Sequence, residues 1–173
     1  LVLQTVSAQQ YYPMLDSINI WNYTGNMIGV STHGEPDFPC SYPNWVYGDG
    51  SMYTGADTVI NSRTYKILYN QNWSACVYGY LREDTAARKI YFLDAIGSPE
   101  ILLYDFSMQI GDTISVNFPN GGGYFSSGLY RLNSITTKMI TAGARKVFNL
   151  NCISCGGPTL EWVESVGNLG DVI

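Results

Sequence analysis

Three segments of the chain repeat one local pattern: a strand-like run, a short polar turn, and a second run with a basic start. β-branched and aromatic residues fill the second runs, which is typical of strands joined as antiparallel hairpins. We therefore predict three hairpins of one design. Their second runs are residues 63–69, 88–93 and 145–150, and the turns before them are Asn61-Ser62, Asp84-Thr85-Ala86 and Thr141-Ala142-Gly143.

Residues 101–110 show the clearest strict alternation in the chain. Because successive side chains of a strand point to opposite faces, this pattern predicts one strand with an apolar face. Gly111-Asp112 then predicts a tight turn into a second alternating run over residues 113–118. Residues 55–59 repeat the same arrangement, with Gly55 and Asp57 as a further turn before a strand. The apolar face of the first strand consists of Leu102, Tyr104, Phe106, Met108 and Ile110.

No window of the chain shows sustained helical spacing with caps, so the fold predicted is all-β. Sequential antiparallel strands must bury one face and protect their edges. We expect an antiparallel meander of hairpins that forms a partly closed barrel or a sandwich, with a slight preference for the barrel. Residues 31–54 are rich in proline, glycine and aromatic residues, which predicts a long ordered loop.

At 173 residues and 46% hydrophobic content, residues 9–173 are expected to form a single domain with a continuous core. Only 13% of residues are charged, and the net charge is −5. This balance argues against a nucleic-acid partner, which would need clustered cations. No run approaches the roughly 18 apolar residues of a transmembrane helix, so no membrane span is expected.

The first ten residues are typical of the end of a secretory signal peptide. A short apolar stretch precedes Val6-Ser7-Ala8, which fits the small-residue cleavage pattern. We expect residues 1–8 to be the remnant of that peptide and the mature chain to begin near Gln9. A first β-strand is the alternative for the same residues. The predicted destination is secretion or the outer cell surface, with the periplasm as the alternative.

Four cysteines in an exported chain favour disulfides. Cys152 and Cys155 are close enough for a local loop, which leaves Cys40 and Cys76 as the natural second pair, although all three connectivities stay open. The Cys-x-x-Cys spacing also occurs in redox and zinc sites. Gly156-Gly157-Pro158 follows it instead of a helix, and no second such pair is present, so we expect neither a metal nor a redox role.

Aromatic residues give the one unusual indication of function, with 14 Tyr and 4 Trp. Such amphipathic rings offer flat contact area with a polar edge, as surfaces that bind sugars or proteins do. We therefore predict a ligand-binding surface for a glycan or a cell-surface protein. The alternative is that these rings only cover a half-exposed sheet. The candidate ligand-binding residues are Tyr42, Trp45, Tyr47, Tyr53 and Trp73.

No complete catalytic motif is present, so we assign no catalytic residue and expect no cofactor. His33 is the one histidine, and no serine has a nucleophile-elbow context. Glu161 and Glu164 could serve a hydrolase, but residues three apart on a strand point to opposite faces. Asp57 and Asp112 have turn positions, where aspartate bonds its own backbone.

An ordered set of motifs runs along the chain, at residues 55–59, 65–69, 80–85, 88–91, 103–107, 111–114 and 162–167. This set resembles secreted β-rich proteins of Bacteroidota whose activity is unknown. The similarity spans about residues 12–170 and implies export and a β-rich module, without catalytic residues to transfer. Relatives often end in a C-terminal type IX secretion sorting domain. Because that tail is not present before Ile173, we expect the native protein to continue or to use another route.

Three functions follow as hypotheses. The leading one is a non-enzymatic secreted or cell-surface module for binding or structure. The second is a lipocalin-like barrel that holds a small apolar ligand, based on the meander and its inward apolar face. The third is a polysaccharide or peptide hydrolase that uses Glu161, Glu164, Asp105 or His33 as acid or base.

Overall fold

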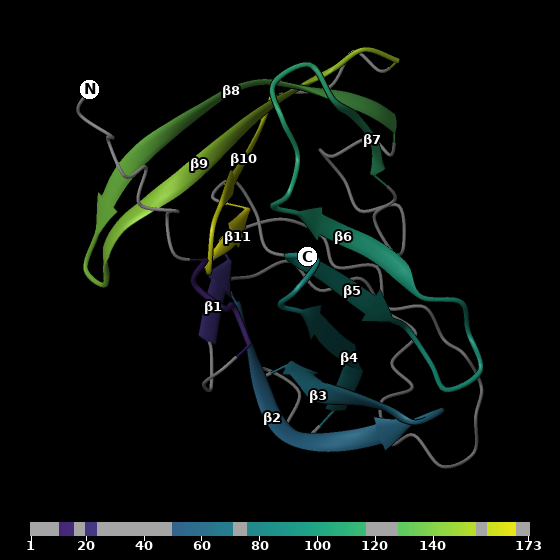
Figure 1. Cartoon of the computed structure of the whole chain (residues 1–173). Helices are drawn as coiled ribbons and strands as arrows, with labels where there is room; N and C mark the ends of the chain where they lie inside the picture. Colours follow the sequence, from purple (N-terminus) through teal and green to yellow (C-terminus); the bar gives the residue numbers. More distant parts are fainter. Residues whose placement is uncertain are drawn as a thin grey trace, which may run out of the picture.

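The computed structural model describes residues 11–15, 20–23, 50–70, 76–116, 128–154 and 159–168. These residues form two antiparallel sheets, and they contain no helix (Figure 1). No described strand of one sheet pairs with a strand of the other, so the sheets are not closed into one barrel. The prediction of an all-β, antiparallel sandwich or partly closed barrel is confirmed.

The six-stranded sheet runs in chain order, so each strand pairs with the next one along the sequence. From β2 to β6 the strands are joined by short connections, which is why local turn signals predicted most of this part of the sheet. Its strands are β1 (Ile20–Tyr23), β2 (Gly50–Ile60), β3 (Arg63–Asn70), β4 (Cys76–Asp84), β5 (Lys89–Leu93) and β6 (Ile101–Asp105).

The five-stranded sheet has the order β11-β10-β9-β8-β7, again a meander. The chain changes sheets between β6 and β7, so these two successive strands do not pair. Its strands are β7 (Thr113–Val116), β8 (Gly128–Ile140), β9 (Gly143–Cys152), β10 (Leu160–Val163) and β11 (Gly167–Asn168).

All three predicted hairpins are confirmed as the pairs β2–β3, β4–β5 and β8–β9. In the first, Asn61 and Ser62 have φ of 50° and 62°, the conformation that a tight two-residue hairpin turn requires. Arg88 at the second turn and Gly143 at the third also have positive φ. Residues with positive φ therefore occur at all three turns, although only Asn61 and Gly143 are of types that adopt this conformation readily.

The predicted strand over residues 101–110 is wrong in its second half, because β6 ends at Asp105. The Asp105 carboxylate accepts hydrogen bonds from the N–H and the hydroxyl of Ser107, and Asp112 accepts one from the N–H of Gln109. These side-chain bonds compete with strand pairing and turn the chain. Tyr104, Phe106 and Met108 are buried as predicted and Leu102 is half-buried, whereas Ile110 is 65% exposed.

The turn predicted at residues 55–57 is also wrong. Gly55 lies inside β2, where the pairing with β3 shifts between Thr54 and Asp57. A Cβ on Gly55 would lie 2.3 Å from the ring of Tyr69, so glycine is needed for close packing at an irregularity of the strand. Asp57 forms an exposed ion pair with Lys66. The Gly111-Asp112 turn is confirmed.

Large aromatic side chains fill the space between the sheets. Tyr104 meets Trp162 edge to face at 5.4 Å between ring centroids, and Phe106 meets Phe148 at 5.5 Å. Each such pair adds about 1 kcal/mol beyond the area that it buries. A second buried cluster consists of Ile60, Tyr65, Tyr80 and Leu93, all from the six-stranded sheet.

Residues 11–15, which we call the strap, fix the first described segment to that sheet. The Glu83 carboxylate of β4 accepts hydrogen bonds from the Tyr11 hydroxyl at 2.6 Å and from the N–H groups of Met14 and Leu15 at 2.9 and 2.7 Å. Met14 and Leu15 are buried in the core. On the other sheet, the guanidinium of Arg145 lies 3.7 Å from the ring centroid of Tyr12. The strap therefore contacts both sheets.

Candidate functional site

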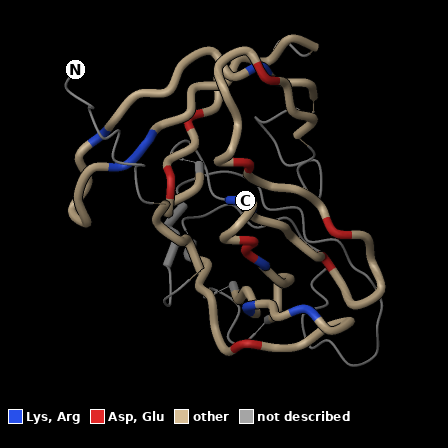
Figure 2. Tube along the Cα trace, in the orientation of Figure 1, with Lys and Arg blue, Asp and Glu red and all other residues tan. Residues whose placement is uncertain are grey.

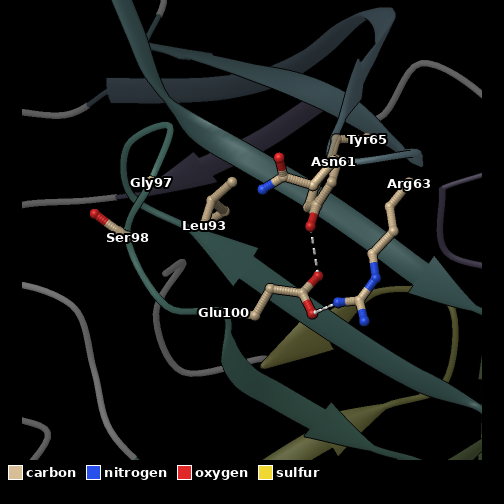
Figure 3. Close-up of a pocket in the computed structure, with 7 residues that line it drawn as sticks. All are labelled: Asn61, Arg63, Tyr65, Leu93, Gly97, Ser98 and Glu100. Carbon is tan, nitrogen blue, oxygen red and sulfur yellow. Dashed lines mark hydrogen bonds and ion pairs between the residues drawn. The ribbon is translucent and has the colours of Figure 1, made fainter.

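A pocket of about 350 Å³ lies at one end of the six-stranded sheet (Figure 3). The β2–β3 turn and the start of β3 form one side, and the loop between β5 and β6 forms the other. Both segments belong to hairpin connections, so strand register sets the distance between them. The described residues that line it are Asn61, Arg63, Tyr65, Leu93, Gly97, Ser98 and Glu100.

Glu100 organises the polar side of the pocket. Its carboxylate accepts hydrogen bonds from Tyr65 Oη at 2.7 Å, from Arg82 Nε at 2.7 Å and Nη2 at 3.0 Å, and from Arg63 Nη1. The contact with Arg82 is a two-pronged pair, which is among the stronger charge-assisted arrangements. Figure 3 shows the carboxylate between Tyr65 and Arg63. One glutamate therefore holds side chains of two neighbouring strands.

Arg82 is held from a second side by an aromatic ring. Its guanidinium lies 4.2 Å from the ring centroid of Tyr91, its cross-strand partner on β5. A cation over a tyrosine face at this distance is attracted by the ring. Arg82 is thus fixed between Glu100 and Tyr91.

The pocket keeps polar groups free for a ligand. Hydrogen bonds from Arg82 are the largest of the causes that hold the pKa of Glu100 below its ordinary value, so the carboxylate is ionised at neutral pH. Two arginines facing one carboxylate leave an excess of one positive charge. The Arg63 side chain is 57% exposed, and among the described contacts nothing engages the Asn61 amide or the Ser98 hydroxyl. Leu93 is only 3% exposed, so it offers almost no apolar surface to a ligand.

A second glutamate lies in very different surroundings. Glu164, directly after β10, is 1% exposed, and within the described part of the chain its Oε2 has no hydrogen-bond partner. Burial raises the pKa of this carboxyl, while Lys146, Arg88 and Arg145 act in the opposite direction. The neighbouring Tyr11 hydroxyl of the strap also has a raised pKa, chiefly from burial.

Of the predicted ligand-binding residues, Tyr53 alone is described. It lies on β2 and stacks on its cross-strand partner Tyr69, at 5.2 Å between ring centroids. That contact explains it as part of the sheet. Outside the described residues lie Tyr42, Trp45, Tyr47 and Trp73, together with His33.

The predicted acids do not meet. Glu161 is exposed on β10 and Glu164 is buried, so the two carboxylates point apart as their spacing predicts. Asp105 pairs with Lys89 at 3.1 Å. The described part of the chain holds no group of three or more His, Cys, Asp or Glu side chains placed to bind a metal ion.

Cys152 is disulfide-bonded. Its partner is not among the described side chains, which exclude Cys40, Cys76 and Cys155, so the pairing stays a prediction.

Comparison with protein-family models, with curated proteins and with solved structures gives no match. Among the described residues, no helix is long and apolar enough to cross a membrane.

Sequence reasoning missed the residues that build the pocket. The sequence pattern identifies Arg63 only as the basic start of a hairpin strand, and Glu100 belongs to no motif. Their meeting depends on the β5–β6 loop returning toward the β2–β3 turn across β4, the strand that separates β3 from β5 in the sheet. The repeated basic start was the one available signal, because a cation at a hairpin end can pair with a carboxylate that the fold brings close to it.

Proposed function

We propose that the chain is an exported, non-enzymatic module that binds a glycan through the pocket at Glu100. The observation that carries this proposal is the combination of free planar polar groups with an excess of positive charge in one open pocket. Arg63 and Asn61 offer donors, and Ser98 adds a hydroxyl. Ligand pockets generally fix the orientation of their ligand with a small number of such polar groups.

The charge of the pocket indicates which class of sugar would bind to it. The excess positive charge of Arg63 and Arg82 over Glu100 favours a sugar that carries a carboxylate or sulfate. The exposed guanidinium of Arg63 keeps donors that Glu100 does not use, and these would face such a group. We therefore expect acidic sugars to bind more tightly than their neutral analogues, by a margin that decreases as salt is raised.

A glycan array with the mature chain, followed by calorimetry on the sugars that bind, tests the proposal. We expect Arg63→Ala to weaken binding at least about tenfold, because a charge-assisted hydrogen bond contributes roughly 1.5–3 kcal/mol. Lys66→Ala is the matched control, since it removes a cation three positions further along β3, where the side chain points to the other face of the sheet. No glycan bound by the wild type, or equal binding by the Arg63→Ala variant, would reject the pocket.

Export belongs to the same proposal and has its own support. Val6-Ser7-Ala8 fits a cleavage site, and the disulfide at Cys152 fits an oxidising compartment. Sequencing the N-terminus of the protein recovered from the outer surface or the medium should give Gln9 as the first residue. An uncleaved chain that stays inside the cell would contradict export.

The other two hypotheses have less support. Tyr104, Phe106 and Met108 are packed into the core between the sheets, where a lipocalin-like ligand would need open space. Glu161 and Glu164 point apart, where a hydrolase would need them to face one substrate.

A further inference from the structure

The hairpin of β8 and β9 extends past both of its neighbours in the sheet (Figure 1). β7 pairs with β8 only over Gly128–Arg131, followed by hydrogen bonds between Leu132 and the Gly111-Asp112 turn. On the other side, β10 and Glu164 reach no further along β9 than Lys146. Beyond these points β8 pairs with β9 alone, as far as the described residues show.

The register identifies which backbone groups of β8 face outward. The C=O of Lys146 accepts a hydrogen bond from the N–H of Glu164, so Lys146 points away from β8. Its cross-strand partner is Thr137, which must point away from β9 in the same way. Because outward and inward residues alternate, Ile135 and Met139 also present N–H and C=O outward.

These outward groups form an open strand edge, which we call the β8 edge: Ile135, Thr137 and Met139. Among the described residues none bonds to their outward N–H and C=O groups. Ile135 is half-buried, whereas the β8 side chains at positions 136–139 are exposed, and Met139 near the tip of the hairpin is 74% exposed. An unpaired, exposed edge is the template onto which an extended segment adds as a further strand.

The charge of this part of the chain is one-sided. Residues 113–160 carry four cations and no carboxylate, in a protein whose net charge is −5. Figure 2 shows Lys and Arg on β8 and β9. Two of these cations are exposed on β8: Lys138 is next to Met139, and Arg131 lies four residues before Ile135, where β8 still pairs with β7.

We propose that the β8 edge binds an extended, acidic segment of a partner protein by strand addition. Backbone hydrogen bonds to Ile135, Thr137 and Met139 give the register, and carboxylates of the segment meet Arg131 and Lys138. A second copy of the chain is the less suitable occupant, because pairing two β8 edges brings together two hairpins that carry cations and no carboxylate.

The direct test uses the whole mature chain and a short synthetic peptide, with glutamate at both ends and alternating valine and threonine between them. We expect the peptide to shift the amide resonances of Ile135, Thr137 and Met139 and to bind more weakly as salt is raised. A peptide N-methylated at alternate residues lacks the backbone donors and should lose at least about tenfold in affinity, a readout that leaves the protein unchanged.

Two variants at position 137 distinguish the contribution of the backbone to peptide binding from that of the side chain. Thr137→Pro removes an N–H that β9 does not use, so it should abolish binding and keep the hairpin, since proline is tolerated on edge strands. Thr137→Ala keeps that N–H and should bind as the wild type does. Lys138→Glu should weaken the peptide and strengthen a version with lysine ends.

Three results would overturn the proposal. One is equal binding by the N-methylated peptide, and another is full binding by a folded Thr137→Pro variant. The third is self-association by sedimentation that Thr137→Pro abolishes, with no binding of the peptide, which would identify a second copy as the occupant.

Discussion

Glu100 and Glu164 are two carboxylates of one two-sheet protein, and their surroundings shift their pKa values in opposite directions. Glu100 receives hydrogen bonds from two arginines and a tyrosine, and its pKa is lowered, mainly by Arg82. Glu164 is almost fully buried, keeps one oxygen without a partner among the described residues, and has a pKa raised by burial. The first region is an open pocket, and the second lies by the strap.

The difference follows from where the partners come from. Arg63, Tyr65 and Arg82 lie on two adjacent strands, so the register of one sheet delivers them to Glu100. Glu164 follows β10, and the cations that act on it come from β9 and from the β4–β5 turn of the other sheet. Contacts within a sheet are fixed by pairing, whereas contacts between sheets depend on how the two layers pack.

The largest change in the free energy of unfolding is expected from a substitution that releases the strap, which contacts the region around Glu164. Glu83→Ala removes the acceptor of the Tyr11 hydroxyl and of the Leu15 N–H, so it leaves a buried donor without that acceptor. We expect a loss of about 3 kcal/mol in the free energy of unfolding, measured with urea. Glu161→Ala, an exposed glutamate on β10, should change it by less than about 0.5 kcal/mol. Equal effects would show that the strap does not stabilise the sandwich.

A smaller change in the free energy of unfolding should distinguish the two arginines that bind Glu100. Arg82 is 16% exposed and makes a two-pronged contact, while Arg63 is 57% exposed. We expect Arg82→Met to cost about 2 kcal/mol and Arg63→Met less than about 1 kcal/mol, since solvent screens exposed pairs. Urea denaturation of both variants at one pH gives the comparison. The reverse order would mean that the exposed guanidinium, and not the stacked one, holds Glu100.

The smallest effect expected is on the pH dependence of the free energy of unfolding, to which Glu100 and Glu164 should contribute slopes of opposite sign. Glu100 has a lowered pKa, so the stability it adds is present above pH 4.5 and is lost as pH falls through its folded pKa. Glu164 has a raised pKa, so its contribution is complete below pH 4.5 and is lost as pH rises through its folded pKa.

Unfolding free energies of Glu100→Gln and Glu164→Gln, each subtracted from the wild type across pH 3–8, measure those slopes. The advantage of the wild type over Glu100→Gln should shrink toward acid, and its advantage over Glu164→Gln should shrink toward neutral pH. Two slopes of the same sign would contradict the comparison.

Local features of the sequence were enough to predict the meander. Asn61-Ser62 and Thr141-Ala142-Gly143 mark turns by residue type, and the runs beside them alternate, so each hairpin is specified within about 20 residues. The end of β6 was not predictable in this way. Alternation continues through Met108, and only the side-chain bonds of Asp105 and Asp112 end the strand.

The pocket was beyond sequence reasoning for a different reason. Asn61 and Glu100 are far apart in the chain, and they meet because the three strands between them, β3, β4 and β5, keep a register that no local pattern encodes. The division into two sheets has the same origin, since the Gly111-Asp112 turn looks alike whether the next strand pairs with β6 or crosses to the other layer.

The strap also imposes an order of assembly. Residues 11–15 precede every described strand, yet Glu83 lies 72 residues beyond Tyr11, and Arg145, which stacks on Tyr12, comes later still. Such distant contacts form slowly, because a long loop must close before they stabilise anything. The first described segment of the chain therefore waits for one of the last strands before it can complete its contacts. The contacts of the strap with both sheets are therefore complete only after β9 has formed.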